Sequence, residues 1–118
     1  MKVLVCGSRG WNNDRIMREV LGYMAEYMTL LIHGDARGAD RKAAEWCEEH
    51  GSCDCLAVPA DWERHGKSAG FKRNLEMLDM LDKRFDTVVA FWDGKSRGTM
   101  HTIENARERG IVCLVVTA

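Results

Sequence analysis

Short apolar runs alternate along the chain with polar loops that contain glycine, and each loop is followed by a stretch with helical periodicity. This order of strand, glycine loop and helix is typical of an open parallel sheet. The apolar runs are continuous rather than alternating, which favours strands that are covered on both faces. The expected strands are residues 3–6, 29–33, 54–58, 87–91 and 111–116, and the expected helices are residues 14–27, 39–50, 69–81 and 99–109.

Apolar spacing predicts which side of each helix packs on the sheet. In the first helix the expected stripe is Ile16, Val20, Tyr23, Met24 and Tyr27. In the second helix the expected inward residues are Ala39, Ala43, Trp46 and Cys47. Gly51 is expected to end the second helix in the left-handed conformation, and Gly110 to stop the last one. Residues 59–68 are expected to be irregular.

We therefore expect one α/β domain over residues 1–118, a Rossmann-like, doubly wound three-layer sandwich with a five-stranded parallel sheet. The expected strand order is 3-2-1-4-5. The loops after the strands, residues 7–11, 33–40, 59–70 and 93–99, then meet at the carboxyl edge of the sheet, where ligands bind. The first and last of these loops flank the expected switch point between strands one and four.

Composition limits the classes of protein that fit. The chain has 118 residues, 46% hydrophobic and 30% charged, with a net charge of −1, so it lacks the global basic field that bulk duplex binding needs. No apolar run could span a bilayer, and the first strand begins too early for a signal peptide. We expect a cytoplasmic protein with five reduced cysteines. Cys53 and Cys55 lack a second pair, so neither a metal site nor a required cofactor is expected.

A set of motifs runs through nearly the whole chain. They are Gly7-Ser8-Arg9 with Trp11 and Asp14, His33-Gly34 with Ala36, Gly38-Ala39-Asp40, Pro59-Ala60-Asp61-Trp62, Gly66-Lys67-Ser68-Ala69-Gly70, Arg73-Asn74, Ala90-Phe91 and Ser96-Arg97-Gly98-Thr99. In this order they resemble the YspA/YpsA-related branch of the SLOG superfamily. That Rossmann-like group also contains the cytokinin-activating LOG proteins and the core of the DNA-processing protein DprA.

The resemblance implies a domain that binds a nucleotide or a nucleotide derivative, often as a sensor. Two departures concern catalysis. The LOG enzymes carry a glutamate within three residues of their Pro-Gly-Gly-x-Gly-Thr stretch, whereas here Met100, His101 and Thr102 follow Thr99 and Glu104 comes later. In addition, Phe71 stands where proline is expected before the Arg73-Asn74 pair.

The residues themselves also indicate an anion site. Gly98 and Thr99 are expected to open the last helix, so free backbone N–H groups and the positive end of the helix dipole point into the loop. Ser96 adds a hydroxyl group and Arg97 a guanidinium that can grip a phosphate. Further positive charge can come from Arg9, Arg37, Lys67, Arg73 and Lys95, although loop cations can also be simply solvated.

Aromatic and acidic residues supply the rest of the expected site. Trp11 and Trp62 either stack on a ligand ring or pack on the sheet edge, and packing is favoured for Trp92. Asp40 either caps its own helix or accepts ribose hydroxyls. Asp61 and Asp93 have no visible capping role, so they are candidates for ribose contact. His33 is expected to be hydrogen-bonded within the loops rather than bound to a metal.

The expected ligand-binding residues are Gly7, Ser8, Arg9, Trp11, His33, Gly34, Gly38, Ala39, Asp40, Asp61, Trp62, Lys67, Gly70, Arg73, Asn74, Asp93, Ser96, Arg97, Gly98 and Thr99. Three functions fit them: binding or sensing of a nucleotide-type ligand, hydrolysis of an N-glycosidic or phosphoester bond, and DprA-like binding of single-stranded DNA. For hydrolysis the catalytic candidates are Asp61, Asp93, Glu104 and Arg97. The helix at 69–81 carries surplus apolar residues, which predicts a homodimer or larger homo-oligomer.

Overall fold

The computed structural model describes residues 1–51 and 53–117 and contains a five-stranded sheet in the order β3-β2-β1-β4-β5. Every neighbouring pair of strands is parallel. The strands are β1 (Lys2–Gly7), β2 (Leu30–His33), β3 (Asp54–Ala57), β4 (Thr87–Phe91) and β5 (Val112–Val116). The predicted α/β class, strand number and strand order are therefore confirmed.

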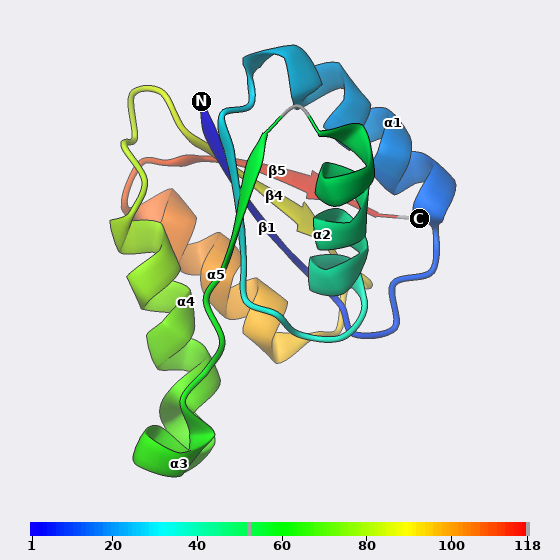
Figure 1. Cartoon of the computed structure of the whole chain (residues 1–118). Coiled ribbons are helices and arrows are strands. Elements are labelled where there is room, and N and C mark those ends of the chain that lie inside the picture. Colours follow the sequence, from blue (N-terminus) through cyan, green and yellow to red (C-terminus); the bar gives the residue numbers. More distant parts are fainter. Residues whose placement is uncertain (52, 118) are drawn as a thin grey trace.

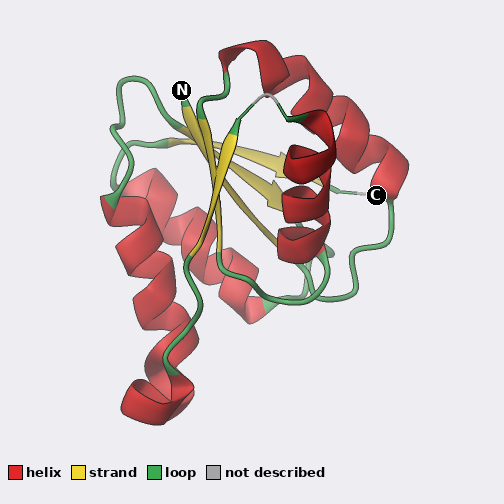
Figure 2. Cartoon of the chain, in the orientation of Figure 1, coloured by secondary structure: helices red, strands yellow, loops and turns green. Residues whose placement is uncertain are grey.

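Helices cover both faces of the sheet, as Figures 1 and 2 show. On one face lie α1 (Asp14–Met24) and α2 (Ala39–His50), and on the other lie α4 (Ala69–Asp79) and α5 (Arg97–Glu108). A short helix, α3 (Trp62–His65), lies at the bottom of Figure 1, beyond the sheet. The single-turn 3-10 helices η1 (Ala25–Tyr27) and η2 (Gly66–Ser68) follow α1 and α3.

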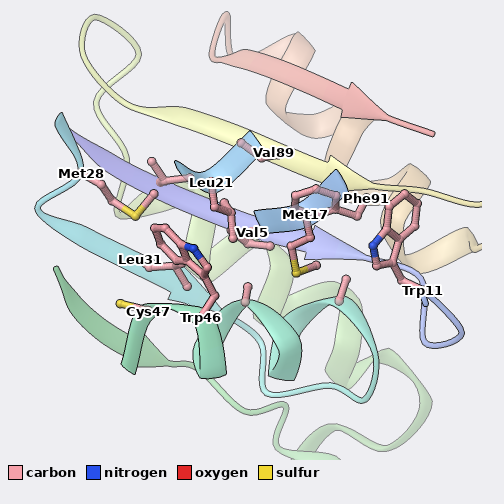
Figure 3. Packing of buried hydrophobic residues seen from close by; sticks show 13 residues of the cluster. Val5, Trp11, Met17, Leu21, Met28, Leu31, Trp46, Cys47, Val89 and Phe91 are labelled. Atoms are coloured by element: carbon pink, nitrogen blue, oxygen red, sulfur yellow. The ribbon is translucent and has the colours of Figure 1, made fainter. Parts of the chain in front are cut away.

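The central strands divide the hydrophobic core into two halves. Val3 and Val5 of β1 face α1 and α2, where they pack with Met17, Leu21 and Phe91 (Figure 3). The alternate residues of the same strand, Leu4 and Cys6, belong to the cluster beneath α4 and α5. Successive side chains of a strand point to opposite faces, so a continuously apolar strand serves both halves of the core.

Burial of the strands is less complete than the sequence predicts. All four residues of β3 are exposed to solvent, and on β5 the side chains of Val112 and Leu114 are 62% and 46% exposed. Both are edge strands, and the described helices pack over the middle of the sheet. The expectation of coverage on both faces is therefore correct for β1, β2 and β4 and wrong for the edges.

The inward stripe of the first helix is also different from the prediction. Met17 and Leu21 are buried, whereas Tyr23 is 86% exposed and Tyr27 lies on η1, with its ring in solvent. Apolar residues occur on two adjacent stripes of this segment: Met17 and Leu21 are buried, and Ile16, Val20 and Met24 of the predicted stripe are partly buried against the same core, so the prediction is wrong only for the two tyrosines. Local spacing does not distinguish the two stripes.

In α2 the prediction is correct: Ala39, Ala43, Trp46 and Cys47 are buried, and Gly51 caps the helix with a φ of 65°.

Residues 59–68 are more ordered than expected, because they contain α3 and η2. The side chain of Asp61 accepts a hydrogen bond from Arg64 N at 3.1 Å and so caps α3, a role that the sequence analysis missed. In the described residues no helix is long and apolar enough to cross a membrane.

Candidate functional site

A cleft with a volume of about 460 Å³ opens at the carboxyl edge of the sheet. It is lined by residues from all four loops that the sequence singles out, together with the start of α4. Its lining is Cys6, Gly7, Arg9, Gly10, Ala36, Asp40, Trp62, Lys67, Gly70, Phe71, Arg73, Asn74, Met77, Asp93, Ser96, Arg97, Gly98, Thr99 and Thr102. This volume is in the usual range for small-molecule pockets.

The N-terminus of α5 forms one side of the cleft. Ser96 caps the helix, with its Oγ accepting from Thr99 N at 3.3 Å. Met100 N makes the first backbone bond of the helix, to Ser96 O, so the N–H groups of Arg97 and Gly98 are left without a helical partner. A Cβ added at Gly98 would meet nothing within 4 Å, so an anion has open access to these donors.

Asp93 shapes the loop that leads into this helix. Its Oδ1 accepts from Lys95 N at 2.8 Å and from Ser96 N at 2.9 Å. These backbone N–H groups, that of Ser96 first, lower the pKa of the Asp93 carboxyl. An ionised carboxylate occupied in this way fixes the Ser96 cap, and this role differs from the expected ribose contact.

Arg73 reaches into the cleft from α4. Its Nη1 donates to Gly34 O in the loop after β2, and its Nε donates to the side-chain oxygen of Asn74 at 3.0 Å. Burial lowers the pKa of the guanidinium, while Asp40 acts in the opposite direction. The side chain is therefore a charged bridge between α4 and the loop at 33–40.

Asp40 is a buried carboxyl that lines the same cleft, with 5% of its surface exposed. Its Oδ2 accepts from Gly34 N at 2.9 Å and from Ala36 N at 3.3 Å, and among the described residues Oδ1 has no hydrogen-bond donor. Burial raises the pKa of Asp40 to about 6, against the lowering effect of the backbone donors and Arg73. The residue ties the loop to its helix rather than capping its own first turn, and one oxygen remains for a ligand.

Ser8 joins three of the loops behind the cleft. Its backbone N–H donates to Phe91 O at 2.9 Å, and its carbonyl accepts from Trp11 N and Ala39 N. Its hydroxyl accepts from Asp93 N at 2.9 Å. Gly38, at a φ of 80°, passes so close that an added Cβ would strike the carbonyl oxygens of Ser8 and Arg9. The loops are thus held in fixed positions by backbone contacts.

The three loop tryptophans have different environments. Trp11 is buried against Phe91, with ring centroids 5.4 Å apart, so its ring belongs to the core (Figure 3). Trp92 is partly buried and donates from Nε1 to Ser96 O. Trp62 lines the cleft with 53% of its surface exposed. Of the three, Trp62 has the ring that a ligand can reach in the cleft.

Comparison with known proteins identifies the family of the chain. Residues 1–65 match the YspA, cpYpsA-related SLOG family. The Gene 61 protein of Mycobacterium phage D29 is 36% identical over 117 residues, which cover 93% of this chain and 91% of that protein. The chain belongs to the YspA, cpYpsA-related SLOG family. The family match includes the loops after β1 and β2, whereas the similarity to the phage protein extends over α4 and α5 as well.

Not every residue predicted for the site of this SLOG-family protein reaches the cleft. Seven lie beside or behind it: Ser8, Trp11, His33, Gly34, Gly38, Ala39 and Asp61. His33 is buried, its Nδ1 accepts from Asp35 N, and burial lowers its pKa. These residues hold the loops, and a local pattern does not distinguish that role from ligand contact.

Six residues of the lining were not predicted: Cys6, Gly10, Ala36, Phe71, Met77 and Thr102. Cys6, Met77 and Thr102 lie in a strand and two helices, where they line the cleft with apolar or hydroxyl groups. The pattern of glycine loops therefore did not mark them. Gly10 and Ala36 lie inside loops that the sequence did single out, and their place next to predicted residues was the available signal. Phe71 was singled out as a departure from the family pattern and as a surplus apolar residue of the helix at 69–81, but not as a site residue.

The catalytic candidates are brought together only in part, because Asp93 and Arg97 line the cleft whereas Asp61 and Glu104 do not. Asp61 caps α3, Asp93 is occupied by backbone donors, and Glu104 lines a neighbouring hollow rather than the cleft. Among these candidates, Arg97 lines the cleft with no side-chain hydrogen bond or ion pair to the described residues. The carboxyl whose raised pKa suits a general base is Asp40. Within residues 1–51 and 53–117 no group of three or more metal-ligating side chains is present.

Proposed function

We propose that the cleft binds a nucleotide or a nucleotide-derived phosphate compound and that the protein acts as a ligand-binding or sensing module. The observation that carries this proposal is the convergence of positive groups in a chain whose net charge is −1. Arg9, Lys67, Arg73 and Arg97 come from separate segments and all line the cleft beside the free N–H groups of α5. Such an arrangement suits a phosphate.

Asp40 supports a ligand that is more than a free phosphate. Its Oδ1 is an acceptor on a buried wall of a cationic cleft, and an acceptor there suits a hydroxyl donor such as ribose. Trp62 supplies an exposed aromatic face at the entrance. A compound with a phosphate, a diol and a flat ring satisfies all three kinds of group.

The test is ligand-induced stabilisation of the folded protein. A nucleotide that binds only the folded state at 100 times its Kd raises the free energy of unfolding by about 2.7 kcal/mol, a shift of several degrees in Tm. We expect at least one of a panel of mono-, di- and triphosphates and ADP-ribose to give this shift. Arg97→Ala is expected to lose most of it with little change in the Tm without ligand.

The matched control is Arg107→Ala, in the last turn of the same helix and about 15 Å from Arg97 along its axis. It removes the same charge far from the cleft, so the ligand shift is expected to persist. An equal shift in wild type and Arg97→Ala would place the anion elsewhere. Chromatography of the same mixtures tests the hydrolase alternative, which requires that the retained compound is converted.

Single-stranded DNA binding is the other alternative, and it needs rings along a groove. Burial of Trp11 removes one of the rings on which that alternative relied. A short oligonucleotide that stabilises the protein while no nucleotide does would favour DNA over our proposal.

We also propose that the protein forms a homodimer or larger homo-oligomer. On α4, Met77 and Leu78 are buried in the monomer, while Phe71 on the same helix and Met80, the residue that follows it, remain exposed at 46% and 36%. Burial of exposed apolar side chains between copies is the physical reason for association. Light scattering is expected to give a mass above that of one 13.4 kDa chain. A monomer mass at all concentrations would refute association.

A further inference from the structure

A second hollow adjoins the cleft. It has a volume of about 370 Å³ and shares Phe71 and Arg97 with the cleft, so a ligand whose phosphate lies at Arg97 can extend into it. Unlike the cleft, this hollow has walls that are mainly aromatic and apolar, formed by Phe71, Trp92, Met100 and His101. Walls of this kind suit a flat ring rather than a phosphate chain.

The aromatic wall is held in place. The rings of Phe71 and His101 are stacked, with centroids 4.4 Å apart and an interplanar angle of 22°. The amide oxygen of Asn74 accepts from Arg73 Nε, so its Nδ2 is the donor that faces His101 Nδ1 at 3.4 Å. Burial lowers the pKa of the His101 imidazole, while Glu104 acts in the opposite direction. This network connects the cleft to the hollow.

The hollow follows one stripe of α5. Arg97, His101 and Glu104 are spaced by four and three residues, so they lie on the same side of the helix. Seven residues at about 1.5 Å each place Glu104 about 10 Å from Arg97 along the axis. A nucleotide with its phosphate at the helix N-terminus can therefore place its base either in this hollow, toward Glu104, or in the cleft beside Trp62.

Two opposite charges lie at the hollow and are available for a ligand. Lys95 and Glu104 both line it, and in the described part of the chain neither side chain takes part in an ion pair. A carboxylate only accepts hydrogen bonds and can accept two in parallel, whereas an ammonium only donates. A base that fits both side chains must carry two adjacent hydrogen-bond donors for Glu104 and, on the same edge, an acceptor for Lys95.

We propose that this hollow holds the base of the bound nucleotide and that Glu104 selects guanine, an inference that rests on the proposed function of the cleft. Guanine presents N1–H and its 2-amino group side by side, which gives the Glu104 carboxylate two donors. Its O6 lies next to them and can accept from Lys95. Adenine offers an acceptor at N1 in the place of the first donor, so it leaves one carboxylate oxygen without a partner.

The test compares GDP, IDP and ADP, which share ribose and diphosphate, by titration calorimetry. GDP is expected to bind about tenfold or more tightly than ADP, because a bidentate contact discriminates bases by this order. IDP lacks the 2-amino group and is expected to fall between them. In Glu104→Gln the difference between GDP and ADP is expected to collapse. The side chain is exposed, so the Tm without ligand should not change.

Glu108→Gln is the matched control, because Glu108 lies one turn further along α5 and is also exposed. It is expected to keep the preference for GDP. Equal affinities for the three diphosphates in wild type would overturn the inference, and so would a GDP preference that survives in Glu104→Gln. A preference lost in Trp62→Leu instead would place the base on Trp62.

These outcomes leave the proposed function standing, provided that diphosphate binding still depends on Arg97. If none of the three diphosphates binds while another member of the nucleotide panel does, this inference fails alone; if nothing in the panel binds, the proposed function fails and this inference fails with it. The two failures are therefore distinguishable in one set of titrations.

Discussion

The two walls of the cleft are built in different ways. The inner wall, residues 7–11 and 33–40, buries Ser8, Trp11, His33 and Asp40, and its polar groups bond to other loops: Ser8 to three segments, Asp40 to two backbone N–H groups. The outer wall, residues 62–70 and 93–98, is mostly exposed and carries Trp62, Lys67 and Arg97 into solvent.

The inner wall therefore sets the shape of the cleft, whereas the outer wall carries side chains that are expected to contact a ligand. On the inner wall, hydrogen-bonding groups are used to fix the backbone, so changes there are expected to affect folding first. On the outer wall the cationic and aromatic side chains have few structural duties, so changes there are expected to affect the ligand first. Pairs of similar substitutions, one on the inner wall and one on the outer wall, can test this division.

The largest effect is expected for glycine at a positive φ. Gly38→Ala combines left-handed strain with contact between the new Cβ and the carbonyl oxygens of Ser8 and Arg9, and should lower the free energy of unfolding by about 3 kcal/mol or more. Gly94 has a φ of 82° on the outer wall with open space around it, so Gly94→Ala should lose only about 1 kcal/mol. Urea midpoints measure both. Equal losses of unfolding free energy in the two variants would contradict close packing around Gly38.

The next effect concerns the pH dependence that Asp40 adds. Its pKa is raised to about 6 in the folded state, above the ordinary 3.8, so the folded protein binds the proton more strongly than the unfolded chain does. Stability from this group is therefore present below about pH 4 and is lost as pH rises to about 6, by up to about 3 kcal/mol.

Asp40→Asn removes the titration while keeping one acceptor for the loop. The free energy of unfolding of wild type minus that of Asp40→Asn is expected to fall as pH rises from 4 to 7. Denaturant titrations across this range check the sign. A difference that stays constant or rises with pH would show that burial does not dominate the environment of Asp40.

The smallest effect on stability is expected for Trp62. Its ring is half exposed, so Trp62→Ala should change the free energy of unfolding by about 0.5 kcal/mol or less. If the ring covers bound ligand, nucleotide affinity falls by about 1–3 kcal/mol. Trp11→Ala on the inner wall is the contrast, since loss of a buried tryptophan should remove about 3–5 kcal/mol of stability. Calorimetry and urea unfolding separate the two quantities.

Much of this protein follows from the sequence alone. Continuous apolar runs followed by glycine loops and amphipathic helices specify a parallel sheet, and right-handed crossovers leave few strand orders to consider. The carboxyl edge then had to hold the four loops, and residues from all of them do line one cleft. The ends of α2 also follow from the local sequence. Its last turn is followed directly by Gly51, which caps the helix, so the signal for the helix end lies beside the end itself.

Tertiary structure decided which polar and aromatic residues face the cleft. Trp11 and Trp62 look alike in sequence, yet one packs on Phe91 and the other lies at the entrance. The contacts that fix such choices join distant parts of the chain: Ser8 meets Asp93 across 85 residues, and Arg73 meets Gly34 across 39. Hydrophobic periodicity describes neighbours along one element, so it carries no information about which distant backbone group a side chain will meet.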